Sequence, residues 1–281
     1  MTKDEQKIFW QGHNRMMLKA KPYYRRKIYE ALQAQIQEAI DNGLTQTAID
    51  SISSAGIMNV LDELYQDIGL KSARRTYTNI RRQATKARMP IGFNEEIVNY
   101  IIQYFRLNIL NSAVAPIMRT TKDFIREVMI KAQQTSQGLR EIVNELLTAD
   151  LTKVRAELIA RTEMNKAANE AEQLGTDKTG FQTQKIWIAT KDKRTRRDHL
   201  TTDEQVVNDG EPFSVGLEKW KMLRPGASKT TDGKEVPAKE VCNCRCVIGR
   251  KVMRGSNGLP LKKNMMQRSI IENKGMPIQV F

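Results

Sequence analysis

The sequence predicts an α+β protein in which a mostly helical N-terminal region is followed by a small α+β domain. Up to about residue 175, apolar residues recur at helical spacing between helix-stop signals. Beyond that point come a β-rich segment, a loop-rich stretch and a second β-rich segment. We therefore predict a helical region over residues 1–138, a small α+β domain over 139–252 and a basic C-terminal tail over 253–281.

The helices are predicted from apolar stripes and from the residues that flank them. The first stripe ends at Asn42-Gly43, and Gly175 similarly marks the end of the last predicted helix. Asn94 is a favourable N-cap for the "EEIVNYIIQYF" stripe, and Pro90 is expected to end the helix before it. These signals predict helices over residues 23–43, 57–89, 95–118, 139–147 and 151–174.

The C-terminal domain is expected to contain two strands. The segments "QKIWIATKD" (184–192) and "EVCNCRCVIGRKV" (240–252) are both rich in β-formers. Residues 203–240 between them are rich in Asp, Gly, Pro, Lys and Thr and have little periodicity. We predict loops there.

Length and composition indicate a soluble protein with room for a substantial core. The chain has 281 residues, of which 40% are hydrophobic, and no apolar run approaches the roughly 20 residues needed to cross a bilayer. The N-terminus is charged and has no apolar signal-peptide segment. We expect a protein of the cytoplasm, or of a particle assembled there, with no membrane contact.

The net charge of +14 favours a polyanionic partner. Basic residues occur in clusters, and phosphate contact requires little beyond fixed positive charge. The alternative is a set of solvated helix faces. The candidate DNA-binding residues are Arg25, Arg26, Lys27, Arg74, Arg75, Arg81, Arg82, Arg196 and Arg197.

All three cysteines lie within five residues, which argues against a disulfide framework. Together with His199, the candidate metal ligands are Cys242, Cys244 and Cys246. Zinc prefers four nitrogen or sulfur ligands in a tetrahedron. Three cysteines on an extended strand would span about 13 Å, which is too wide for one ion unless the chain turns. The alternative is that the thiols are small buried groups that attach the last strand to the core.

An ordered set of motifs in the C-terminal half resembles a known family. The motifs are "ELIARTEMNKAANEAEQLG", "WIATKDKRTRRDHLTTDEQVV", "EPF", "LRPG" and "NCRC". In this order, over about residues 139–249, they resemble the phage Mu F-like head-morphogenesis family. The residues that match are Arg161, Thr162, Glu163, Trp187, Asp192, Arg194, Thr195, His199, Asp203, Pro225, Gly226, Asn243, Cys244, Arg245 and Cys246.

The resemblance implies a structural minor head protein of a tailed phage, located in the virion at the portal vertex, with host cytoplasm as the place of assembly. Its implied partners are the portal protein, a major capsid or scaffold protein and double-stranded genomic DNA bound without sequence preference. Its implied roles are head assembly and handling of packaged DNA. The sequence departs from the family twice: Arg196 and His199 stand where many members have cysteines, and Glu204 stands where many have a turn glycine.

The motif residues have a structural interpretation that needs no catalysis. We expect Glu163 to accept hydrogen bonds from Arg194, and Asp192 from Arg245, so that helix, loop and closing strand are held together. The candidate structural residues are Arg161, Thr162, Glu163, Asp192, Arg194, Asp203, Asn243 and Arg245.

We predict that the protein is not an enzyme, with zinc as the one candidate cofactor. A zinc-dependent, basic nucleic-acid-binding protein of cellular origin is the alternative. A His-Asn-type nuclease is a third hypothesis, because His199 lies beside Asp198 and upstream of Asn208. Such a centre needs a second histidine, and the other one, His13, lies far away in the helical region.

Overall fold

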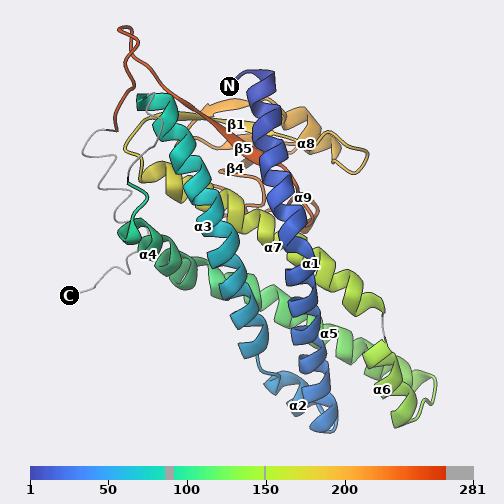
Figure 1. Ribbon diagram of the computed structural model, residues 1–281. Coiled ribbons are helices and arrows are strands. Elements are labelled where there is room, and N and C mark those ends of the chain that lie inside the picture. The colour runs from blue at the N-terminus through green and yellow to red at the C-terminus, as the bar shows by residue number, and fades with distance from the viewer. Residues whose placement is uncertain (86–91, 149, 264–281) are drawn as a thin grey trace.

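The computed structural model describes residues 1–85, 92–148 and 150–263 (Figure 1). It confirms the predicted α+β class, with long helices first and a small antiparallel sheet region after them. The helices of the first part are α1 (Lys3–Asp41), α2 (Gln46–Ser51), α3 (Ala55–Thr85), α4 (Glu95–Tyr104), α5 (Leu110–Gln134), α6 (Leu139–Thr148) and α7 (Asp150–Asp177), with a π-helical turn (Phe105–Ile109) between α4 and α5.

Helix α1 is much longer than predicted. It ends at the cap Asn42 as expected, but it begins at Lys3, where Thr2 and Glu5 form a capping box. Residues before 23 were missed because this half of the helix buries only Phe9 and His13 and contains Pro22. Phe9 packs against strand residues from the far end of the chain, so tertiary contact supports a stretch whose own pattern is weak.

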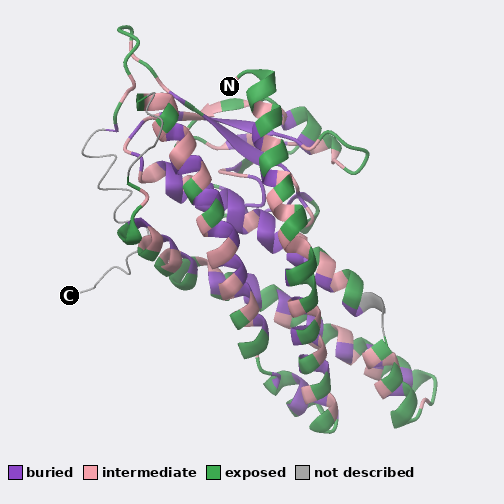
Figure 2. Cartoon of the chain, viewed as in Figure 1, coloured by how far each residue is buried: buried purple, intermediate pink, exposed green. Residues whose placement is uncertain are grey.

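The main core lies where α1, α3 and α7 cross (Figure 1), and α7 is the most completely buried of the three (Figure 2). Its buried face is built from alanines, which allow the neighbouring helices to approach closely. Gly175 does not end this helix, contrary to the prediction, and α7 continues to Asp177. A Cβ at Gly175 would lie 2.6 Å from the carbonyl oxygen of Ala73, so glycine is required by the crossing with α3.

The small sheet has the strand order β2-β1-β5 and is antiparallel throughout. Trp187 in its centre faces Ile248 across the β1–β5 pair and is fully buried. A separate hairpin, β3–β4, packs Phe213 against Trp187 with ring centroids 5.3 Å apart. The elements of this part are β1 (Thr183–Ile188), α8 (Arg197–Thr202), β2 (Val206–Asn208), β3 (Phe213–Val215), β4 (Trp220–Met222), α9 (Ala238–Val241) and β5 (Val247–Val252).

The strand predictions are partly wrong. The first strand ends at Ile188, and the second begins only at Val247, because residues 238–241 form a helical turn and residues 242–246 a loop. The three strands β2, β3 and β4 lie where loops were predicted, since segments of three residues are too short to show an alternating pattern. The N-cap at Asn94 is confirmed: its side chain accepts from the backbone N–H of Ile97.

Across the described ranges, no helix is both long enough and apolar enough to cross a bilayer. Pro90 and residues 264–281 of the predicted basic tail lie outside those ranges. The proposed domain boundaries after residues 138 and 252 stay predictions. Helix α7, which lies within the predicted second domain, contributes Ala160 and Ala168 to the same core as Leu61 of α3.

Candidate metal centre and the motif residues around it

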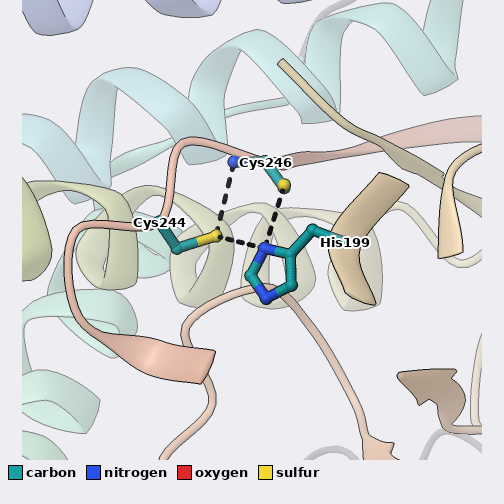
Figure 3. Close-up of side chains that lie close together, drawn as sticks. All are labelled: His199, Cys244 and Cys246. Carbon is teal, nitrogen blue, oxygen red and sulfur yellow. Dashed lines mark hydrogen bonds between the residues drawn. The ribbon is translucent and has the colours of Figure 1, made fainter. Parts of the chain in front are cut away.

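His199, Cys244 and Cys246 form a compact buried cluster (Figure 3). Both sulfur atoms point at the same ring nitrogen, His199 Nδ1, from 3.6 Å (Cys244) and 3.4 Å (Cys246). The three candidate ligand atoms all lie within 4.8 Å of one another, and no side chain in the group is more than 2% exposed. Three residues separated by up to 47 positions thus converge on one point.

The loop that carries the cysteines turns instead of running straight. Asn243 adopts a left-handed backbone conformation, with φ of 59°, between Cys242 and Cys244. Cys242, on the other side of this turn from Cys244, lies outside the cluster, so the prediction of Cys242 as a ligand is not supported by the geometry. Cys242 is half-buried, and its carbonyl accepts a hydrogen bond from Arg196.

The other nitrogen of the His199 ring faces a carboxylate. Glu240 Oε2 lies 3.2 Å from His199 Nε2, and Glu240 is itself 2% exposed. Trp187 packs edge-to-face on the imidazole with centroids 5.5 Å apart. The ring therefore lies between the thiols and Glu240, with Trp187 on its face, and the approach of Glu240 to Nε2 is close but lacks hydrogen-bond geometry. A metal-bound histidine typically has a carboxylate beside the ring nitrogen that does not bind the metal, and Glu240 occupies that position.

The cluster favours a thiolate at Cys244. The hydrogen bond from Cys246 lowers the pKa of the Cys244 thiol well below its ordinary value, against the effect of burial, and His199 lowers it further. The same hydrogen bond and burial raise the pKa of Cys246. Burial opposes protonation of His199, but its contacts with Cys244 outweigh burial, so the pKa of His199 is raised. Thiolate is the form of cysteine that binds metals.

The donor set fits zinc. With Zn–S of about 2.3 Å and Zn–N of about 2.0 Å, ligand atoms of a tetrahedral site lie about 3.5 to 3.8 Å apart. The two observed nitrogen–sulfur distances, 3.4 and 3.6 Å, are close to this range. Within the described residues, His, Cys, Asp and Glu side chains supply three ligands, and Glu240 lies on the wrong side of the ring to be a fourth.

The other motif residues tie this loop to α7. Asn243 is held twice: its Oδ1 accepts from Arg161 at 2.5 Å, and its backbone N–H donates to Thr162 Oγ1 at 2.9 Å. Arg245 makes the predicted bidentate pair with Asp192, which is confirmed. This pair lowers the pKa of Asp192 below its ordinary range. The contacts form a clasp between α7, the loop after β1 and the loop before β5.

The predicted pair between Glu163 and Arg194 is wrong. Glu163 is buried and accepts instead from the Tyr65 hydroxyl at 2.7 Å and from Lys166 at 2.9 Å. Arg161 and Glu163 are two positions apart on a helix, so their side chains point in different directions. Arg161 contacts Asn243 of the clasp, and Glu163 contacts Tyr65 in the helical core. Arg194 is 66% exposed, and its ion pair among the described residues is with Asp192 at 3.8 Å.

The turn after α8 keeps the backbone shape that the family's glycine would supply. Asp203 Oδ1 accepts from the backbone N–H of Ala189, which fixes the turn against the end of β1. Glu204, at the glycine position, has a φ of 64°. Few side chains adopt this conformation readily, so the turn is retained at some cost in backbone strain.

The predicted DNA-binding residues are scattered over several elements, and some are engaged internally. Arg75 forms an ion pair with the fully buried Glu172 at 2.7 Å, and Arg196 donates to the Cys242 carbonyl. Arg81 lies over the Phe181 ring. Arg25, Arg26 and Lys27 each lie within 4 Å of a carboxylate. Those exposed to solvent are Arg25, Arg26, Arg74, Arg82 and Arg197.

Three charged residues that form ion pairs in this part of the protein were not predicted from the sequence. Glu240 precedes the cysteines directly, and a carboxylate next to candidate metal ligands is a usable signal. Glu157 pairs with Arg161 at 2.6 Å one helical turn away, which is an i,i+4 spacing visible in the sequence. Arg224 of the "LRPG" motif forms a buried pair with Glu170, which no sequence pattern indicates.

Fold and site together define an α+β protein in which a small sheet region contains a buried His–Cys cluster and is tied to the long helix α7 by the clasp. Residues 123–249 match the model of the family described as Phage Mu protein F like protein. This confirms the resemblance seen in the motifs: residues 123–249 are a Mu F-like segment, and the His–Cys cluster and its clasp lie within it.

Among curated proteins, the chain is similar to "Minor head protein GP7" of Bacillus phage SPP1, with 31% identity over 100 residues. The similar region covers 35% of this chain and 30% of that protein, so the chain matches less than a third of its relative's length. No solved structure matches the chain significantly.

Proposed function

We propose that this protein is a structural minor head protein of a tailed phage, incorporated into the virion. The observation that carries the proposal is the Mu F-like segment over residues 123–249, together with the similarity to a protein named a minor head protein. The clasp residues agree with a structural role, because each is engaged with a protein partner. We further propose association with the portal vertex and with a capsid or scaffold protein during head assembly.

A catalytic role is not part of the proposal. A His-Asn-type nuclease needs a histidine that can reach its substrate. His199 is 1% exposed, with two thiols beside Nδ1 and Glu240 beside Nε2. The alternative of a cellular zinc-dependent nucleic-acid-binding protein is disfavoured by the match to a phage family.

The proposal predicts that the protein is found in particles. Mass spectrometry of purified virions and procapsids of the phage that encodes this chain should detect it at a fixed ratio to the portal protein. Purified tails serve as the control and should contain none. Absence of the protein from both virions and procapsids would refute a structural head role.

We also propose sequence-independent binding of double-stranded DNA through the exposed cations. The net charge of +14 supports this, although several candidate arginines have internal partners. Affinity should fall steeply with salt, and removing one phosphate contact should reduce the log–log salt slope by about 0.9. We expect this reduction for Arg82→Gln, measured by fluorescence anisotropy with a random-sequence duplex.

The control for DNA binding is Lys239→Gln. Lys239 is exposed and forms an ion pair with Glu218. Lys239→Gln therefore lowers the net charge by the same amount as Arg82→Gln, but it removes a cation that a carboxylate already neutralises. If the two variants have equal log–log salt slopes, or if the wild-type affinity for DNA does not depend on salt, the proposed contact between Arg82 and DNA is refuted.

We propose that the cluster of His199, Cys244 and Cys246 binds zinc, as a structural element of the Mu F-like segment. The support is the geometry of three buried nitrogen and sulfur atoms, with Glu240 behind the histidine. Bound metal would hold the loop before β5 to α8, because these elements supply the ligands.

A further inference from the structure

A pocket of about 440 Å³ lies between α1, α7 and the loops after β1 and before β5. Its volume is within the range of small-ligand sites, about 300 to 1,000 Å³. It shares a wall with the metal centre, since Cys244 lines it. The function proposed above makes no use of this pocket.

Three arginines from three separate segments line the pocket: Arg161 of α7, Arg194 of the loop after β1, and Arg245 beside Cys244. Lys21 of α1 is a fourth cation. The pocket contains only two carboxylates, Glu157 and Asp192, among its lining residues. Four cations against two carboxylates leave a surplus of positive charge, which remains even when Cys244, whose sulfur faces His199, is a thiolate.

The surplus is concentrated around Arg161, which is 20% exposed. Burial lowers the pKa of its guanidinium; Glu157 offsets part of this, and the nearby charges of Arg194 and Arg245 lower it again. Like charges are thus held close together in a partly dehydrated site. A bound anion would relieve this repulsion.

Two buried polar atoms on the inner wall of the pocket lack a hydrogen-bond partner. Asn165 and His13 are 4% and 3% exposed, and both line the pocket. In the described part of the chain, neither Asn165 Nδ2 nor His13 Nε2 has a hydrogen-bond partner. Burial lowers the pKa of His13, so its ring is neutral and adds no further charge. A buried polar atom without a partner is costly unless a ligand or water satisfies it.

We propose that this pocket binds a phosphate monoester, with the phosphate held by the arginine side chains and the rest of the ligand against Asn165, His13 and Trp10. A phosphate monoester carries close to two negative charges at neutral pH, so it offsets more of the positive charge of the pocket than a single carboxylate would. Arginine is suited to phosphate because its planar fork can donate two hydrogen bonds at once. Trp10 offers an aromatic surface at the mouth for a nucleobase.

The group could be presented by a free nucleotide or by a 5′-phosphorylated end of DNA, and the experiment distinguishes the two. Isothermal titration of the full chain, at roughly 0.15 M salt to screen weak surface attraction, would compare AMP with adenosine. A 5′-phosphorylated duplex would be compared with the same duplex carrying a 5′-hydroxyl. N-acetylglycine, which carries a single carboxylate, provides the carboxylate probe.

We expect AMP or the phosphorylated duplex to bind, and adenosine and the hydroxyl duplex to bind far more weakly. Binding of AMP identifies a nucleotide site, and binding of the phosphorylated duplex alone identifies a DNA end. Arg194→Gln should weaken phosphate binding about tenfold, the value of one charge-assisted hydrogen bond. This variant should fold normally, because Arg194 is exposed and makes only one distant ion pair.

The matched control is Lys193→Gln, which removes the neighbouring exposed cation of the same loop without altering a pocket-lining residue. It should leave the affinity unchanged. The proposal is overturned if no phosphate probe binds, if the two variants weaken binding equally, or if N-acetylglycine binds as tightly as AMP. None of these results bears on whether the protein is part of the virion.

Discussion

The Cys244→Ser variant is expected to lose stability in the region from β1 to β5 while the helical core stays folded. Without metal, the loss should be about 1 to 3 kcal/mol, because a hydroxyl replaces a buried sulfur that faces His199. With zinc bound, the loss should be larger, because the metal-binding free energy is then part of the folding free energy. Hydrogen exchange followed by mass spectrometry would measure protection over residues 183–252 and over α1 and α3 separately.

A chelator distinguishes a cluster that binds zinc from a cluster whose thiols only pack. If zinc is bound, elemental analysis should find about one ion per wild-type chain, and strong chelator should lower the melting temperature of the wild type but not of Cys244→Ser. If the thiols only pack, chelator should change neither protein.

Cys242→Ser is the matched control, since Cys242 belongs to the same loop but lies outside the cluster. It should change protection little. Unchanged protection over residues 183–252 in Cys244→Ser would show that the cluster does not stabilise the domain.

A second large effect is expected at Asp209, the centre of a buried ion network. Asp209 accepts from Arg250 and Gln173 and lies 3.2 Å from Lys263. Arg250 is 3% exposed at its side chain. Asp209→Asn removes the carboxylate and leaves two buried cations with less compensation, so we expect a loss of about 3 to 5 kcal/mol in the free energy of unfolding. Urea denaturation would measure it.

The pH dependence of this effect has a defined sign. Burial disfavours the ionised Asp209 carboxylate, but the charges of Arg250 and Lys263 outweigh burial and hold its pKa at about 2, below its ordinary value of 3.8. A carboxyl group with a lowered pKa in the folded state stabilises the protein above the unfolded pKa and loses this contribution as pH falls. The difference between wild type and Asp209→Asn should therefore shrink from pH 4 towards pH 2.

Glu218→Gln is a suitable control for Asp209→Asn. Glu218 also pairs with a lysine, Lys239 at 3.4 Å, but both side chains are more than half exposed. Removal of this surface pair should cost less than about 1 kcal/mol and should not depend on pH in the same window. A similar loss for both variants would mean that burial does not strengthen the Asp209 network.

Much of the fold could be predicted from local patterns. The α+β class, the helix end at Asn42 and the cap at Asn94 follow from residues close together in the chain. The family resemblance came from the order of short motifs, and the pair between Asp192 and Arg245 followed from the charges those motifs place at the ends of β1 and β5. Each of these depends on side-chain type and spacing, which the sequence displays directly.

Other features were decided by tertiary contact. The first half of α1 forms because Phe9 packs on the sheet, and Gly175 lies inside α7 because the backbone of Ala73 approaches it closely. Glu163 turns to Tyr65 because α3 offers a buried hydroxyl there. Such contacts join residues about 100 or more positions apart, and no local pattern records them.

The candidate sites show the same division. The sequence by itself determined which residue types were available: one histidine and three cysteines for a metal, and several arginines for an anion. Only the tertiary structure decided that the turn at Asn243 leaves Cys242 outside the cluster and that Glu240 faces His199. It also brought Arg161, Arg194 and Arg245 to one pocket. The physical reason is that binding depends on distances of a few ångströms between atoms, and these are set by how helices and loops pack, not by their order along the chain.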